Sequence, residues 1–171
     1  QAFAPLIIES KGRIVTTGSI AGIVTTPIFG IYSMSKHAIE AYNDGLAQEM
    51  ARYGVSVHVI EPGTYKSNIG YAAKKLLDDT NYWPEDTAYK QERAYLFDAM
   101  TKIDQQPDPA QVGTAALHAM QSDTPRKRYM VIETVAQADR VLRRQLSKML
   151  ELNDGQVHEF DRTRLVEMLD E

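Results

Sequence analysis

The sequence predicts an α/β fold in which helices cover both faces of a parallel sheet. Residues 13–17 and 55–60 are short apolar segments rich in β-branched side chains, as in buried parallel strands. Between them, apolar side chains recur about every four residues from residue 33 to residue 53, as in an amphipathic helix. A strand, a helix and a strand in this order form a right-handed crossover between parallel neighbours. We therefore expect a doubly wound sheet, of which this chain holds about three strands.

The remaining elements follow from local start and stop signals. Residues 1–11 resemble the last turns of an amphipathic helix closed by Gly12. Asp108 and Pro109 form a helix start, and that helix is expected to run to about residue 121, before a short third strand at residues 129–132. Further helices are expected at residues 85–102, 135–150 and 161–169, with a break at residues 153–155. Residues 68–107 are otherwise the least regular part.

Composition excludes several classes of protein. The 171 residues match one domain, and 43% hydrophobic with 25% charged residues is ordinary for a soluble globular protein. A net charge of −4 argues against a nucleic-acid partner, which usually requires a basic face. The absence of cysteine excludes disulfides and thiolate metal sites, and no metal site is predicted. No apolar segment approaches the roughly 20 residues of a membrane span, and we expect a cytoplasmic protein.

Three side chains between Gly12 and Lys36 are candidates for catalysis. Ser19 follows the first strand, at the sheet edge where open α/β sheets bind ligands. Tyr32 and Lys36 are four residues apart at the start of the next helix and so share a face. An ammonium about 4 Å from a phenol, at an effective dielectric of about 20, stabilises the phenolate by roughly 4 kcal/mol before desolvation is subtracted. Tyr32 is therefore a candidate general acid or base, and Ser19 could donate a hydrogen bond to the same substrate oxygen.

These residues carry a resemblance to a known family. Ser19 in TGSIAG, Tyr32 and Lys36 in YSMSK, and Pro62-Gly63 after the second strand resemble the short-chain dehydrogenase/reductase family. The TGS form and the spacing from Ser19 to Tyr32 are similar to its hydroxysteroid and retinol dehydrogenase branch. The resemblance covers about residues 1–135. A Y-x-x-x-K pair alone is weak evidence, and Tyr71 with Lys75 is interpreted as a chance match.

The resemblance implies a Rossmann-like domain and a nicotinamide cofactor, NAD or NADP. Tyr32 and Lys36 would contact the cofactor together with Pro62 and Gly63, and Thr64 or Ser67 would bond its carboxamide or phosphates. The family's glycine-rich pyrophosphate turn is missing, so we expect this chain to be the C-terminal part of a longer protein. The resemblance also implies a homodimer or homotetramer, with the helix after Tyr32 packed against its copy. The alternative is that this apolar stripe serves only the internal core.

Three parts of the chain are given separate roles. Residues 1–134 are expected to be the C-terminal part of one dehydrogenase domain, and residues 135–171 a helical extension packed on it. Residues 68–107 hold several aromatic side chains among charges and are interpreted as a lid over a substrate pocket. The alternative is a small satellite core of these aromatic residues. If the lid interpretation holds, a lipophilic alcohol or ketone is the expected substrate.

The predicted activity is the NAD(P)-dependent interconversion of an alcohol and its carbonyl, with Tyr32 exchanging the proton on the oxygen. A nicotinamide-containing epimerase or dehydratase can use the same tyrosine and lysine, without net change in the cofactor. A non-catalytic dinucleotide-binding protein is a further alternative, and it would tolerate the loss of Tyr32. The pattern of Ser19, Tyr32 and Lys36 favours the oxidoreductase.

Overall fold

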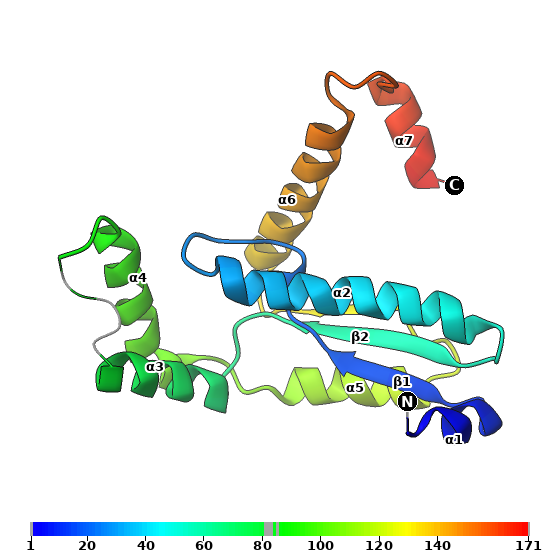
Figure 1. Cartoon of the computed structure of the whole chain (residues 1–171), viewed down its shortest axis with the longest axis horizontal. Coiled ribbons are helices and arrows are strands. Elements are labelled where there is room, and N and C mark those ends of the chain that lie inside the picture. The colour runs from blue at the N-terminus through cyan, green and yellow to red at the C-terminus, as the bar shows by residue number, and fades with distance from the viewer. Residues whose placement is uncertain (1, 81–83, 85, 171) are drawn as a thin grey trace. The chain divides into compact units, whose positions relative to one another are not determined.

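The computed structural model describes residues 2–80, 84 and 86–170, which form two compact units, Gln1–Glu133 and Thr134–Glu171. The first unit contains a parallel sheet of three strands in the order β1-β2-β3 (Figure 1). Its strands are β1 (Arg13–Thr17), β2 (Ser56–Pro62) and β3 (Arg128–Val131). Both pairings are parallel, with Thr17 opposite Ile60 and Pro62 opposite Val131. The expected α/β class and number of strands are therefore confirmed.

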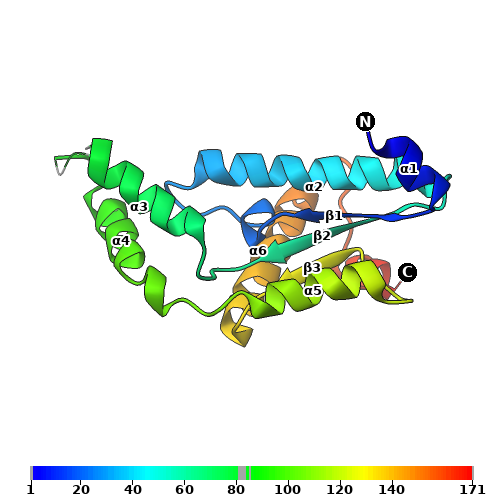
Figure 2. The same ribbon diagram turned by 90° about the horizontal axis from the view of Figure 1, so that it is seen from below.

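Helices cover both faces of this sheet, with α2 (Gly30–Ala51) on one face and α5 (Ala110–Gln121) on the other (Figure 2). The alternation of side chains along β2 explains the division. Val57 packs with Met50 in the cluster on the α2 side, whereas Ile60 packs with Ala119 on the α5 side. Because β2 is buried on both faces, its sequence is nearly continuous in apolar residues.

Several predicted elements differ from the structure in their ends. The strand predicted at residues 55–60 continues through Pro62, so the expected turn begins only at Gly63. Helix α1 (Ala4–Glu9) is closed by Lys11, which takes a φ of 47°, and not by Gly12. The helix start at Asp108 is confirmed, because its Oδ1 accepts a hydrogen bond from the backbone N–H of Ala110 at 2.8 Å.

The segment interpreted as a lid is more regular than predicted. It contains α3 (Asn68–Thr80), α4 (Lys90–Thr101) and the 3₁₀ turn η2 (Ile103–Gln105). The sequence analysis missed α3, where ion pairs between Lys74 and Asp78 and between Lys75 and Asp79 span one helical turn. The helix predicted from residue 85 begins at Lys90, whereas the aromatic residues Tyr82 and Trp83, and Glu85, lie outside the described residues.

Tyr71 and Lys75, the second Y-x-x-x-K pair, have other partners within this segment. The hydroxyl of Tyr71 donates to Asp104 Oδ1 at 2.5 Å, and Lys75 pairs with Asp79. Lys66 also pairs with Asp104, at 3.3 Å. The bond from Tyr71 to Asp104 joins α3 to η2, and the ion pair of Lys75 lies within α3. We therefore assign this tyrosine and this lysine a structural role.

The second unit consists of α6 (Val135–Asn153) and α7 (Arg162–Asp170). The side chain of Thr134 caps α6 by accepting from the backbone N–H of Gln137. Asn153 closes the connection by bonding both backbone groups of Phe160, at 3.0 and 2.9 Å. The unit is thus a helical hairpin, and its packing on the first unit stays a prediction. Within the described part of the chain, no helix is both long enough and apolar enough to cross a membrane.

Candidate active site

Ser19 lies in the loop that follows β1, at the carboxyl end of the sheet. It caps the short 3₁₀ turn η1 (Ile20–Gly22), because its Oγ accepts a hydrogen bond from the backbone N–H of Ala21 at 3.1 Å. The same hydroxyl donates to the carbonyl oxygen of Pro62 at 3.4 Å. The hydroxyl is therefore held between the ends of two neighbouring strands, where a ligand oxygen could replace the long bond to Pro62.

Tyr32 and Lys36 lie on the first turns of α2, as predicted. The ammonium of Lys36 lies 5.7 Å from the centre of the Tyr32 ring and donates to the carbonyl oxygen of Gly18 at 3.1 Å. Lys36 is thus held by the residue that precedes Ser19. Tyr32 is 37% exposed, its ring packs edge-on against Phe29, and its hydroxyl makes no hydrogen bond to any described residue. The structure therefore gathers Ser19, Tyr32 and Lys36 around one loop and leaves the phenol accessible.

The predicted cofactor-binding residues are divided between the strand end and the segment beyond it. Pro62 is the last residue of β2, and the backbone N–H of Gly63 donates to the carbonyl of Val131 at 2.8 Å. A side chain at position 63 would lie 2.9 Å from Ile132, so the close approach that requires glycine here is to β3. Thr64 and Ser67 are exposed, and the hydrogen bonds of Ser19 and Lys36 among the described residues go to other partners.

The donor set suits a ribose and an amide better than a metal ion. Among the described residues, no group of three histidine, aspartate or glutamate side chains is arranged to hold a metal. The half-buried ammonium of Lys36, together with the exposed hydroxyls of Thr64 and Ser67, offers hydrogen-bond donors to oxygen atoms. These groups fit a nicotinamide cofactor at the carboxyl ends of β1 and β2.

Beneath this loop lies a charged network that the sequence analysis missed. Glu61 on β2 is 1% exposed, and the Arg128 guanidinium on β3 lies 3.4 Å from its carboxylate. Arg128 also pairs with Glu40 on α2 at 3.2 Å. Burial raises the pKa of Glu61 to about 8, and the charge of Glu40 and a hydrogen bond to it add to the rise. In the sequence, the one sign of this network was Glu61, an acidic residue at the end of an otherwise apolar strand.

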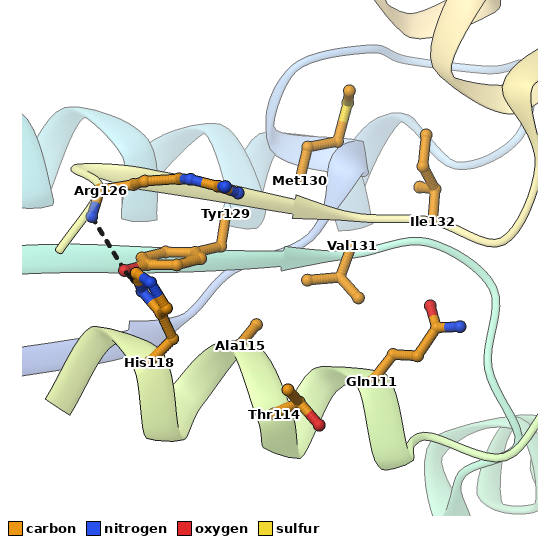
Figure 3. A pocket seen from close by; sticks show the side chains of 9 residues that line it. All are labelled: Gln111, Thr114, Ala115, His118, Arg126, Tyr129, Met130, Val131 and Ile132. Carbon is orange, nitrogen blue, oxygen red and sulfur yellow. Dashed lines mark hydrogen bonds between the residues drawn. The ribbon is translucent and has the colours of Figure 1, made fainter. Parts of the chain in front are cut away.

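A separate cavity of about 290 Å³ lies between α5 and β3 (Figure 3). Its lining includes His118, Arg126 and Tyr129, and none of the predicted site residues. The hydroxyl of Tyr129 accepts from the backbone N–H of Arg126 at 2.9 Å and bonds His118 Nδ1 at 2.8 Å. These polar groups satisfy one another, so the cavity is not a second candidate for the chemistry.

Comparison with known proteins agrees with this geometry. The sequence profile of the family described as short chain dehydrogenase matches residues 1–76. The chain belongs to the short-chain dehydrogenase/reductase family. It is 38% identical over 122 residues to the NADPH-dependent 3-dehydrocapnine reductase of Ornithobacterium rhinotracheale, covering 71% of this chain and 42% of the relative. It is 32% identical over 142 residues to the mitochondrial D-beta-hydroxybutyrate dehydrogenase of Mus musculus, covering 75% of this chain and 40% of the relative.

Solved structures of this dehydrogenase family share the fold. A short-chain dehydrogenase from Streptomyces avermitilis superposes with a TM-score of 0.65 and 24% identity, over 87% of this chain and 52% of that one. The predicted Rossmann-like fold is therefore confirmed. The chain spans less than half the length of the curated relatives named above.

Proposed function

We propose that this short-chain dehydrogenase is an NAD(P)-dependent oxidoreductase that interconverts an alcohol and its carbonyl. One observation carries the proposal. Lys36 links the loop of Ser19 to Tyr32, because its ammonium donates to the carbonyl of Gly18 and lies 5.7 Å from the ring of Tyr32, which is 37% exposed. A purely structural role would not explain why Tyr32 is partly exposed next to an ammonium that is fixed by a bond to Gly18.

Each of the three residues has its own task in this proposal. Tyr32 gives a proton to the substrate oxygen in reduction and takes it back in oxidation. Lys36 holds the loop of Ser19 through the carbonyl of Gly18 and offers its ammonium to the hydroxyls of a ribose. Ser19 orients the same substrate oxygen by a hydrogen bond from Oγ, in place of its long bond to Pro62.

Pro62, Gly63, Thr64 and Ser67 would hold the cofactor, either NAD or NADP. When bound, the nicotinamide supplies or accepts the hydride. Pro62 and Gly63 offer backbone at the strand end, and Thr64 and Ser67 offer exposed hydroxyls to an amide or a phosphate. One relative is named as NADPH-dependent, which supports a nicotinamide cofactor in this chain.

The substrate and the oligomer belong to the same proposal. Residues 68–107 would cover a lipophilic alcohol or carbonyl, and exposed Ile69, Leu76 and Tyr95 on α3 and α4 support an apolar surface there. A homodimer or homotetramer would form through α2, where Met34 is 67% and Tyr42 is 61% exposed. On the same helix, no other described part of the chain lies within 4 Å of the position that a β-carbon on Gly45 would take, which leaves room for a close neighbour from a second subunit.

Replacing Tyr32 by phenylalanine in the complete protein tests this function. We expect turnover of a carbonyl panel, followed by NADH or NADPH absorbance, to fall by about 10²–10⁴-fold or more, since that is the contribution of general acid–base catalysis. Cofactor affinity, measured by NAD(P)H fluorescence, should change little. Tyr53→Phe is the matched control and should retain full turnover, because Tyr53 lies just beyond the other end of α2 and is 41% exposed, close to the 37% of Tyr32. Retained activity in Tyr32→Phe would refute the role.

A further inference from the structure

Five charged side chains, from α2, β2 and the start of β3, form one network next to the catalytic loop. Arg128 Nε lies 3.2 Å from Glu40 Oε2 and 3.4 Å from Glu61 Oε1, and Arg128 Nη2 lies 2.8 Å from Asp44 Oδ2. Lys127 in turn pairs with Asp44 at 3.0 Å. Three carboxylates thus face two cations, and the group carries one excess negative charge when all are ionised. A buried excess charge is costly unless a proton neutralises it.

Two oxygen atoms in this group show where that proton belongs. Glu40 Oε1, Glu61 Oε1 and Asp44 Oδ1 are buried without a hydrogen-bond partner among the described residues. Asp44 Oδ1 still has the ammonium of Lys127 at 3.0 Å, whereas the nearest cation to Glu61 Oε1 is Arg128 Nε at 3.4 Å, so the two glutamates are the oxygens in need of a proton. Ionised carboxylates only accept hydrogen bonds, so two of them cannot satisfy each other. A single proton on Glu61 turns its carboxyl into a donor to Glu40 and balances the charge of the group.

This carboxyl pair touches the loop that carries the catalytic groups. A β-carbon at Gly18 would lie 3.1 Å from Glu40 Oε1, and one at Gly22 would lie 3.0 Å from Glu40 Cγ. Glu40 therefore packs against both ends of the turn that begins at Ser19. Glu40 follows Lys36 by one helical turn, and Glu61 precedes Pro62, whose carbonyl accepts from Ser19.

We propose that Glu40 and Glu61 share a proton and act as positioning residues, which hold the loop from Gly18 to Gly22 and, through it, Ser19 and Lys36. The proposal deepens the proposed function and rests on it for its catalytic consequence. When the proton leaves, two buried carboxylates repel each other, and Glu40 withdraws from the glycines it supports. Because Gly18 then moves, the hydrogen bond from Lys36 to the carbonyl of Gly18 weakens.

The charged groups that face the pair are Asp44 from α2 and Arg128 from β3, with Lys127 behind Asp44. His58 points to the opposite face of β2 from Glu61, as the alternation of the strand requires, and bonds the carbonyl of Arg126. The pKa of Glu61, about 8, places the release of the proton just above neutrality.

Nuclear magnetic resonance on the complete protein tests the pair without relying on activity. With ¹³C-labelled glutamate, one carboxyl signal should titrate near pH 8 and vanish in Glu61→Gln, whose amide donates permanently. The backbone amide signals of Gly18, Ser19 and Gly22 should move with the same midpoint in the wild type and stay still in Glu61→Gln and Glu40→Gln. Glu49→Gln, exposed on the same helix, should leave both titrations unchanged. The proposal would be overturned if no carboxyl signal titrated above about pH 6.5, or if the amide signals of the loop did not move with that titration.

Turnover provides the second readout. In the wild type we expect kcat for reduction to fall by about tenfold from pH 7 to pH 9, within the cost of a small misplacement of catalytic groups. Glu61→Gln should remove this fall. An unchanged pH profile in Glu61→Gln would refute the positioning role. If the wild type shows no nicotinamide-dependent turnover at all, the proposed function fails, and the carboxyl and amide titrations still decide whether the pair exists.

Discussion

Tyr32 and Tyr129 both lie beside a positively charged side chain, yet the structure uses them in opposite ways. Lys36 lies 5.7 Å from the Tyr32 ring, and the Arg126 guanidinium lies 5.9 Å from the Tyr129 ring. Tyr129 is 4% exposed, and its hydroxyl bonds both a histidine and a backbone N–H. Tyr32 is 37% exposed and keeps its hydroxyl uncommitted. A nearby cation therefore accompanies both a tyrosine whose hydroxyl is bonded within the fold and one whose hydroxyl has no partner among the described residues, and only the second fits the proposed proton transfer.

Removing each cation tests the comparison most strongly. Lys36→Met should lower kcat/KM by about 10²-fold or more, because the site loses the ammonium that bonds the carbonyl of Gly18 and lies next to the ring of Tyr32. Arg126→Met should leave kcat/KM within about twofold, since Tyr129 takes no part in the chemistry. Steady-state kinetics of both variants with the same carbonyl substrate measure the difference. Equal losses in the two variants would show that the two tyrosines do not differ in the way proposed.

A change of pH should affect the two regions unequally. Burial raises the pKa of Glu61 from 4.5 to about 8, so the folded protein holds this proton more tightly than the unfolded chain does. The free energy of unfolding should therefore fall as the pH rises from about 4.5 to about 8, and Glu61→Gln should remove roughly 4 kcal/mol of that fall.

Denaturant unfolding of the wild type and Glu61→Gln at a series of pH values measures this contribution. Glu49→Gln, which changes an exposed glutamate on α2, is the control and should follow the wild type. If the free energy of unfolding depended on pH in the same way in the wild type and in Glu61→Gln, folding would not raise the proton affinity of Glu61.

The smallest expected effect concerns the hydroxyl of Tyr129. Tyr129→Phe should lower the free energy of unfolding by about 1–3 kcal/mol, because the backbone N–H of Arg126 loses its partner in a partly buried position. Tyr32→Phe should change the free energy of unfolding by less than about 0.5 kcal/mol, as an exposed position does. Thermal or denaturant unfolding of the two variants gives the comparison, and a reversed order would contradict it.

Local patterns were enough to predict most of the first unit. The β-branched composition of β1 and β2 and the periodicity of α2 depend on neighbours in the chain, and so does the one-turn spacing of Tyr32 and Lys36. The helix α3 was missed because aromatic and charged residues obscure its apolar stripe, although its ion pairs at four-residue spacing were a usable signal.

By itself, the sequence determined the α/β class, the order of strand, loop and helix, and the three side chains that the loop after β1 brings together. Only the tertiary structure decided that Glu40, Glu61 and Arg128, which are far apart in the chain, meet beneath that loop. It also decided which tyrosine keeps an accessible hydroxyl. The reason is physical: the proton affinity and hydrogen bonding of a side chain depend on burial and on partners from distant segments, and neither is encoded in the local pattern of residues.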